Sequence, residues 1–207
     1  MDLEIAVAEA AMIPRALTLA LVFTLVVAVP PGARAGEPTE QLRTEIDELY
    51  RTVKQAPAPP AAGRESTAVL DRMFDWGRMA EAALRGHWQQ RTAVERTEFT
   101  SLFADLFRRA YVARVNLVDA SRFQYLGDAT DGTRGEVKTK VMTKRGSTLD
   151  VDYAVRRGDS GRWRVEDVRV EQLSLIENYR IQFHTIITRA SYPALAAKLR
   201  ERGAQAQ

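Results

Sequence analysis

Few side chains in this sequence are arranged for catalysis. The chain contains only two histidines, His87 and His184, and no cysteine, and neither histidine lies at a metal-ligand spacing from another histidine. The motifs G-x-S-x-G and H-E-x-x-H and a glycine-rich phosphate loop are absent as well. Ser174 and His184 could be nucleophile and base, but a serine directly before an apolar helical stripe is better explained as a helix cap. These patterns favour packing or capping roles over nucleophilic, metal or nucleotide chemistry.

Asp167 is the carboxylate with the best case for acid–base chemistry. It lies where the alternation of apolar residues slips by one position between Val165 and Val168, which predicts a β-bulge near Glu166 and Asp167. A bulge can turn a side chain inward, and a buried aspartate beside an apolar pocket can be a general base, as in cone-shaped isomerases. The alternative, which we favour, is that Asp167 faces water or bonds a neighbouring backbone amide.

Helices must position the first half of the chain. Apolar residues at three- and four-residue spacing predict helices in residues 37–120, interrupted by the proline-rich segment 55–63. Asp75 is expected to cap one helix, and Thr92 with Glu95 forms a capping box that opens the longest one. We leave open whether residues 37–120 form a layer on a sheet or a separate helical lobe.

A period of two takes over in residues 121–172. Leu149, Val151, Tyr153 and Val155 alternate with polar residues, and a turn is predicted at residues 127–132. Short turns between consecutive strands predict a four-stranded antiparallel meander. Ser174 and Glu177 form a second capping box, and helices follow over residues 174–202. The class is therefore α+β: a curved sheet with helices packed over its concave face, enclosing an apolar pocket.

The N-terminus has the features of an export signal. A basic residue, Arg15, precedes a mainly apolar region of fourteen residues and a small-residue cleavage pattern that ends at Ala35. We therefore predict a signal peptide over residues 1–35 and one domain over 36–207. The acidic residues before Met12 make Met12 the expected start. Without cysteine, disulfides and a lipidated N-terminus are excluded. The net charge of +3 comes from interspersed charges, which argues against nucleic-acid binding.

Two blocks of residues resemble a known family. Residues 165–183 run from a strand into V-E-Q-L-S-L and N-Y-R-I-Q-F, and residues 73–103 contain M-F-D-W-G-R-M, A-L, G-H-W and E-F-T-S-L-F. Both are similar to the MlaC-type periplasmic phospholipid carriers, also called the toluene-tolerance family, over about residues 42–199. Gln172 is a departure, because the family usually has glycine there, and the local backbone conformation is open.

The resemblance implies a non-enzymatic function without a cofactor. It implies a soluble periplasmic carrier, cleaved near Ala35, that holds the acyl chains of a phospholipid in a hydrophobic pocket. The implied partners are an inner-membrane ABC transporter complex with a lipid-binding ring subunit and an outer-membrane lipoprotein complex, in a role in outer-membrane lipid asymmetry. Arg180 is a candidate for the pocket mouth, contacting phosphate or pairing with an acidic neighbour. From their facing, the residues expected to line the pocket are Phe103, Phe107, Tyr111, Val141, Val151, Tyr153, Val165, Val168, Leu173, Leu175, Tyr179 and Phe183.

Two other functions stay open at this point. The first is a binding protein for another apolar lipid, such as a hopanoid, although the N-Y-R-x-Q-F form favours phospholipid. The second is an isomerase- or hydratase-like enzyme on a cone-shaped fold, with Asp167 as base.

Overall fold

The computed structural model describes residues 36–55, 63–115 and 118–204. The predicted signal peptide, residues 1–35, lies outside the described residues. The described chain is α+β, with an open antiparallel sheet and six α-helices. The helices are α2 (Glu37–Gln55), α3 (Arg64–Met73), α4 (Trp76–Leu84), the 3₁₀-helix η2 (Arg85–Gln90), α5 (Ala93–Val115), α6 (Leu175–Arg189) and α7 (Tyr192–Ala204).

The sheet has five strands rather than the four predicted. Each strand pairs with the one before it, in the order β1-β2-β3-β4-β5. The extra strand is a two-residue piece that folds back on the end of β4. The strands are β1 (Val118–Asp131), β2 (Arg134–Thr143), β3 (Thr148–Arg157), β4 (Trp163–Val170) and β5 (Leu173–Ser174).

The reversal from β4 to β5 uses two residues with left-handed backbone. Glu171 has φ of 49° and Gln172 has φ of 67°, and they connect the paired residues Val170 and Leu173. Positive φ at both central residues is what a type I′ hairpin turn requires, and glycine adopts it at the lowest cost. The glycine that the resemblance implies for position 172 would suit this turn. In this chain the Gln172 side chain donates to Asp152 Oδ2 at 3.2 Å.

The predicted bulge in β4 is confirmed. Ala154 of β3 pairs with Asp167, whereas the next residue, Val155, pairs with Val165, so Glu166 is the additional residue in β4. The turn predicted at residues 127–132 begins later than expected, because β1 continues to Asp131 and the chain turns at Gly132 and Thr133. The chain passes Gly127, with φ of 118°, at an irregularity of the β1–β2 register.

The three predicted helix starts are confirmed. Asp75 accepts from the backbone N–H of Arg78 at 3.1 Å at the start of α4. Thr92 and Glu95 form the reciprocal capping box, with the Thr92 N–H 2.8 Å from Glu95 Oε2 and the Glu95 N–H 3.2 Å from Thr92 Oγ1. Ser174 accepts from the N–H of Glu177 at 2.9 Å, which starts α6 immediately after the last strand.

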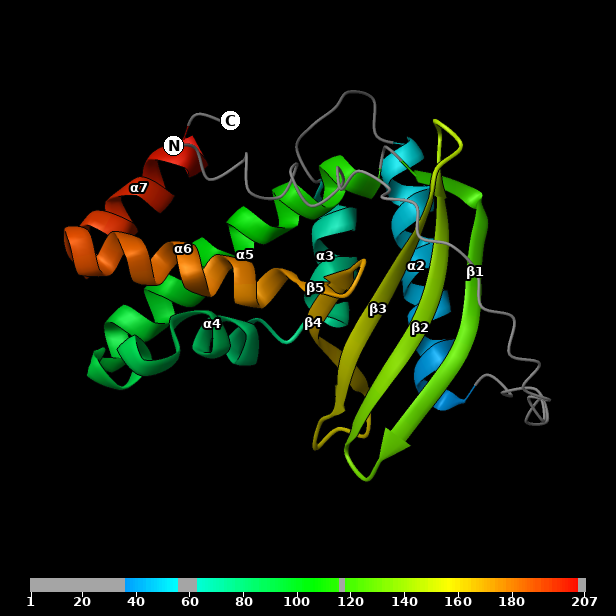
Figure 1. Ribbon diagram of the computed structural model, residues 1–207, viewed down its shortest axis with the longest axis horizontal. Helices are drawn as coiled ribbons and strands as arrows, with labels where there is room; N and C mark the ends of the chain where they lie inside the picture. The colour runs from blue at the N-terminus through cyan, green and yellow to red at the C-terminus, as the bar shows by residue number, and fades with distance from the viewer. Residues whose placement is uncertain (1–35, 56–62, 116–117, 205–207) are drawn as a thin grey trace, which may run out of the picture.

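The helices lie in two positions relative to the sheet (Figure 1). Helix α2 runs alongside the strands and packs on β1 and β2, whereas α4 to α7 extend to one side, beyond β4. One continuous cluster of buried apolar side chains nevertheless joins all of these helices to the sheet. The first half of the chain therefore supplies both a layer on the sheet, from α2, and part of a helical group beside it.

A single carboxylate fixes the beginning of α2. Asp128 of β1 accepts from the backbone N–H of Gly36 at 2.7 Å and from Thr39 Oγ1 at 2.5 Å. A Cβ at residue 36 would lie 2.5 Å from the Asp128 carboxylate, so only glycine fits without movement. Because the first turn of a helix carries partial positive charge, an aspartate here is favourable.

Candidate functional site

Aromatic side chains form the largest continuous feature of the interior. They come from the α3–α4 junction, from one face of α5 and from one face of α6, and the ring centroids of touching pairs lie 5.1 to 6.2 Å apart, many in edge-to-face geometry. The helical spacing that predicted the apolar stripes is the reason these rings meet. The connected rings are Phe74, Trp76, Phe99, Phe103, Phe107, Tyr111, Tyr179 and Phe183.

Most of the residues predicted to line a pocket lie in this interior. On the sheet, five of them are buried: Val141, Val151, Tyr153, Val165 and Val168. On the helices, Phe103, Phe107, Tyr179 and Phe183 are buried, while Tyr111 and Leu175 are partly buried. The two groups meet where the hydroxyls of Tyr111 and Tyr153 lie 3.2 Å apart. That these residues line a lipid pocket stays a prediction.

Leu173 differs from the other predicted lining residues. It is 49 % exposed. Its position in the short strand after the left-handed turn explains the exposure, since β5 lies at the edge of the sheet and extends the chain for only two residues. The structure does not bring Leu173 into the interior with the rest.

A group of tyrosine hydroxyls lies where α2, α5, β1 and β3 meet. Burial raises the pKa of Tyr111 well above its usual value, and the neighbouring Tyr153 adds to this. Burial raises the pKa of Tyr125, the charge of the Asp47 carboxylate raises it further, and the charge of Arg43 lowers it. Burial also raises the pKa of Tyr153, against the hydrogen bond with Tyr111, which lowers it. These phenols are therefore neutral hydrogen-bonding groups at any physiological pH.

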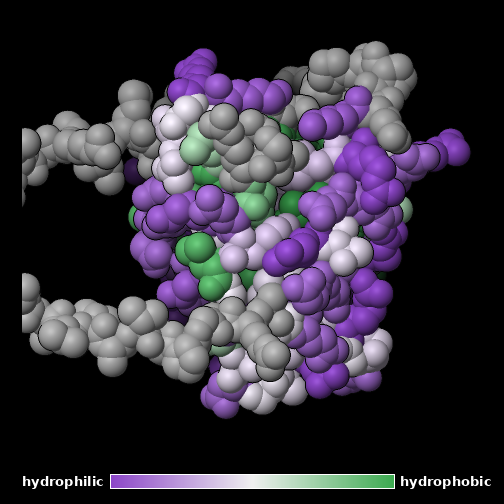
Figure 2. Space-filling view, turned by 90° about the vertical axis from the view of Figure 1, so that its right-hand side faces the viewer, coloured by the Kyte–Doolittle hydropathy of each residue, from purple (hydrophilic) through white to green (hydrophobic). Residues whose placement is uncertain are grey.

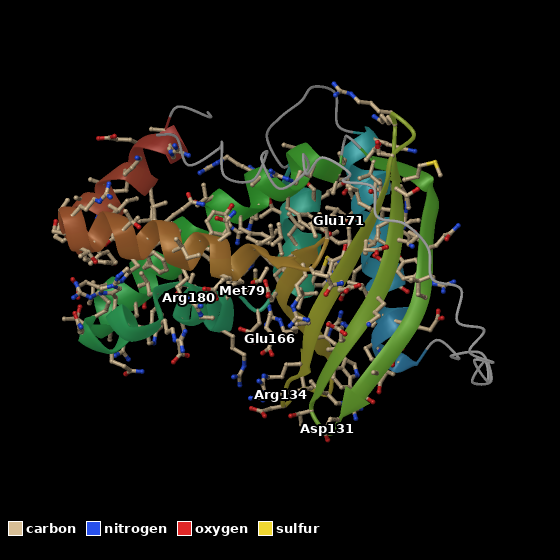
Figure 3. The ribbon with its side chains drawn as sticks, viewed as in Figure 1. Met79, Asp131, Arg134, Glu166, Glu171 and Arg180 are labelled. Carbon is tan, nitrogen blue, oxygen red and sulfur yellow. The ribbon has the colours of Figure 1, made fainter. Side chains whose placement is uncertain are left out.

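Arg180, the predicted mouth residue, forms an ion pair with Glu177 one turn earlier in α6. The structure thus shows the pairing with an acidic neighbour, and a place for Arg180 at the pocket mouth stays a prediction. Figure 3 shows Arg180 on the side of α6 that faces α4. It lines a surface pocket of about 460 Å³ between α6 and the α4–η2 segment, together with Leu84, Arg85, His87, Ile181 and His184.

The two histidines meet in this same surface pocket. Nε2 of His87 lies 2.9 Å from Nδ1 of His184, across 97 residues of sequence. Partial burial lowers the pKa of His87, and the positive charges of His184 and Arg91 lower it further. Spacing within the sequence could not reveal this contact, because it depends on how η2 packs on α6. Within the described ranges, no cluster of three or more possible ligands could hold a metal ion.

The residues weighed as catalytic groups have structural partners. Asp167 accepts from the backbone N–H of Ile176 at 3.2 Å, so the backbone-bonding alternative is confirmed. Burial raises the pKa of the Asp167 carboxyl, and its hydrogen bonds partly oppose this by lowering the pKa. Ser174 caps α6. His184 lies ten residues further along the same helix, which corresponds to about 15 Å and excludes a hydrogen-bonded nucleophile–base pair with Ser174.

None of the helices in the described part of the chain combines the length and the hydropathy needed to cross a bilayer.

Comparison with known proteins identifies a family and a similar fold. The model of the family described as MlaC protein matches residues 43–201. The structure of a phospholipid-binding protein from Ralstonia solanacearum, in complex with a phospholipid, aligns with a TM-score of 0.68 and 24% sequence identity, covering 82% of this chain and 98% of that chain. At this identity the likeness shows the fold. A separate comparison with curated proteins found no match to the chain.

Proposed function

Because the chain belongs to the MlaC family, we propose that it is a soluble, non-enzymatic carrier of phospholipid in the periplasm. The observation that carries the proposal is the family match over residues 43–201, on a fold shared with a protein whose structure holds a phospholipid. The interior supports it, because the predicted lining residues of the sheet and of α5 and α6 face one another around aromatic side chains. The acyl chains occupy this apolar interior, between the sheet and the helices.

The energetics of acyl chains determine how such a carrier works. Two chains contain roughly 30 methylene groups, and at ~0.8 kcal/mol each their transfer to water costs on the order of 20–25 kcal/mol. A lipid therefore does not leave the protein through water at a useful rate. Transfer between a bilayer and an apolar interior exchanges two similar media, and its net free energy can be small. The carrier must dock on a membrane-bound complex so that the lipid passes directly.

The partners we propose follow from this requirement. The sequence contains no nucleotide-binding motif, so direction must come from the complexes on which the carrier docks. We assign these roles to an inner-membrane ABC transporter complex with a lipid-binding ring subunit and to an outer-membrane lipoprotein complex. The residues after the predicted cleavage at Ala35 then act in the space between the two membranes.

Native mass spectrometry of the purified protein tests the proposed ligand. We expect a mass increment equal to one phospholipid, identified by extraction and fragmentation. A terpenoid mass would support a hopanoid carrier instead. A protein that stays empty after incubation with phospholipid vesicles would contradict the proposal.

Filling the interior should abolish binding. Val151 is 9% exposed on the inner face of β3, so Val151→Trp places a large side chain where the acyl chains are expected. The matched control is Val94→Trp, because Val94 is 78% exposed near the start of α5. We expect Val151→Trp to fold, by circular dichroism, and to lose co-purified lipid, while Val94→Trp keeps it. Full lipid occupancy in Val151→Trp would show that Val151 does not line the pocket.

A further inference from the structure

Two buried polar atoms without hydrogen-bond partners belong to side chains that lie next to each other. Among the described residues, Arg43 Nε and Tyr125 Oη are buried side-chain atoms with no hydrogen-bond partner. They come from different elements, α2 and β1, yet the guanidinium carbon of Arg43 lies 4.7 Å from the centroid of the Tyr125 ring. Buried polar groups are normally satisfied, so two adjacent donors that are not satisfied point to a missing acceptor.

The position of this pair is on the inner face of the sheet. Tyr125 pairs with Thr139, which pairs with Val151, and Tyr153 follows two residues after Val151 on the same face. Tyr153 in turn hydrogen-bonds Tyr111 of α5. Tyr125 is thus the β1 member of the group of tyrosine hydroxyls described above. The aromatic interior continues from this group through the contact between Tyr111 and Phe107.

Arg43 connects this interior with water. Its side chain is 42% exposed, and it forms an ion pair with Glu40, which is 57% exposed and 3.7 Å away. Such an exposed pair is weak and easily exchanged. Figure 2 views the molecule from the β1 side, and apolar residues come to the surface there among hydrophilic ones. An arginine at such a boundary can face a polar group outside while the apolar part of the same molecule lies inside.

The chemistry of the ligand follows from the donors. Arginine N–H and tyrosine O–H both donate, and the guanidinium is always charged. The matching group offers acceptors only, carries negative charge, and is joined to apolar chains. A phosphodiester next to a carboxylic ester has these properties.

We infer that Arg43 and Tyr125 form a polar subsite for the glycerophosphate of the bound lipid, with Arg43 contacting the phosphate and Tyr125 donating to an adjacent ester carbonyl. The inference rests on the proposed function and deepens it. It places the polar end of the lipid between α2 and β1, away from Arg180, whose guanidinium is paired with Glu177.

A competition experiment tests the phosphate contact. Delipidated protein is offered vesicles that contain equal amounts of phosphatidylglycerol and diacylglycerol with the same acyl chains, and the bound ratio is read by native mass spectrometry. We expect the wild type to prefer phosphatidylglycerol by about tenfold or more, as a charge-assisted hydrogen bond implies. Arg43→Gln should lose most of this preference, and Arg43→Lys, which keeps the charge, should lose less. Arg51→Gln, at an exposed position of the same helix, is the control and should behave as the wild type.

A second competition tests Tyr125. Diester phosphatidylglycerol is offered together with its dialkyl ether analogue, which lacks the carbonyls. The wild type should prefer the ester by several-fold, and Tyr125→Phe should bind both equally.

The outcomes separate the inference from the function. If Arg43→Gln keeps the wild-type preference, or if the wild type binds ester and ether lipids equally, the corresponding contact is wrong while phospholipid carriage stands. If the wild type binds no phospholipid from either mixture, the proposed function fails, and the subsite fails with it.

Discussion

At the scale of single residues, the contact between His87 and His184 links the stability of the protein to pH. The rings lie in hydrogen-bonding contact, beside Arg85 of η2, Arg91 just after it and Arg180 of α6. Only one proton can lie between the two nitrogens, so protonation of both rings replaces a hydrogen bond with repulsion.

The sign of this effect follows from His87. Its pKa is lowered in the folded protein relative to the usual value of 6.5, so the unfolded chain binds more protons in that range and stability falls as pH falls through it. We expect the melting temperature to drop between pH 7.5 and pH 5.5, and the drop to be smaller in His87→Gln. The carboxyls of Glu45 and Asp167 have raised pKa values, so their contribution to stability changes with pH in the opposite direction. This contribution is the same in the wild type and in His87→Gln, so comparing the two proteins removes it. Equal drops in both proteins would contradict a role for the pair.

The β4–β5 turn has a left-handed backbone at Gln172, although this residue is not glycine. The family pattern has glycine where this chain has Gln172, and the sequence alone left the conformation there open. The structure keeps the turn, with φ of 67° at Gln172, and adds the side-chain bond to Asp152. Left-handed backbone costs roughly 1 to 2 kcal/mol in a residue with a Cβ. One hydrogen bond of about 1 kcal/mol offsets part of this.

At the scale of elements, the cap of α6 joins the sheet to the helix that carries Tyr179 and Phe183. Ser174 ends β5 and accepts from the N–H of Glu177, and Asp167 of β4 accepts from the N–H of Ile176. Two of the orphan donors at the helix start are thereby satisfied, one of them by a carboxylate across the sheet.

Removing this cap should loosen α6 measurably. We expect Ser174→Ala to lower the free energy of unfolding by about 1 kcal/mol, read from urea denaturation. Ser101→Ala is the control, because Ser101 is exposed within α5 and alanine favours a helix interior. A loss no larger than in the control would show that Asp167 alone holds the helix start.

Local signals predicted elements well and contacts poorly. Caps at Asp75, Thr92 and Ser174 and the bulge at Glu166 depend on neighbouring residues, so the sequence was sufficient for them. The fifth strand depends on an unusual turn without glycine, which carries no local signal. Two contacts depend on the packing of elements that are distant in the sequence: that of Arg43 with Tyr125 and that of His87 with His184. The spacing of residues in the sequence does not predict such contacts.

At the scale of the whole molecule, the sheet and the helical group share one apolar interior. The buried side chains run without interruption from Leu42 in α2 to Leu199 in α7. The resemblance to a lipid carrier was needed to interpret this interior, because the same residue types fill a core and line a pocket. In the proposed complex the two parts of the lipid have separate surroundings, with the acyl chains among the rings of α5 and α6 and the phosphate beside α2.

The aspartate that holds the beginning of α2 would make stability depend on the predicted cleavage after Ala35. Signal-peptide cleavage after Ala35 would convert the Gly36 amide into an α-ammonium group, which has a pKa near 8 and lies 2.7 Å from the Asp128 carboxylate. An ordinary hydrogen bond then becomes an ion pair that exists only in the processed chain. We expect a chain beginning at Gly36 to be more stable than one that retains residues 30–35, by about 1 kcal/mol at low salt, and Asp128→Asn to remove the difference. Cleavage at the predicted site would thus strengthen a contact that the uncleaved chain already makes, and hold the start of α2 more firmly against β1.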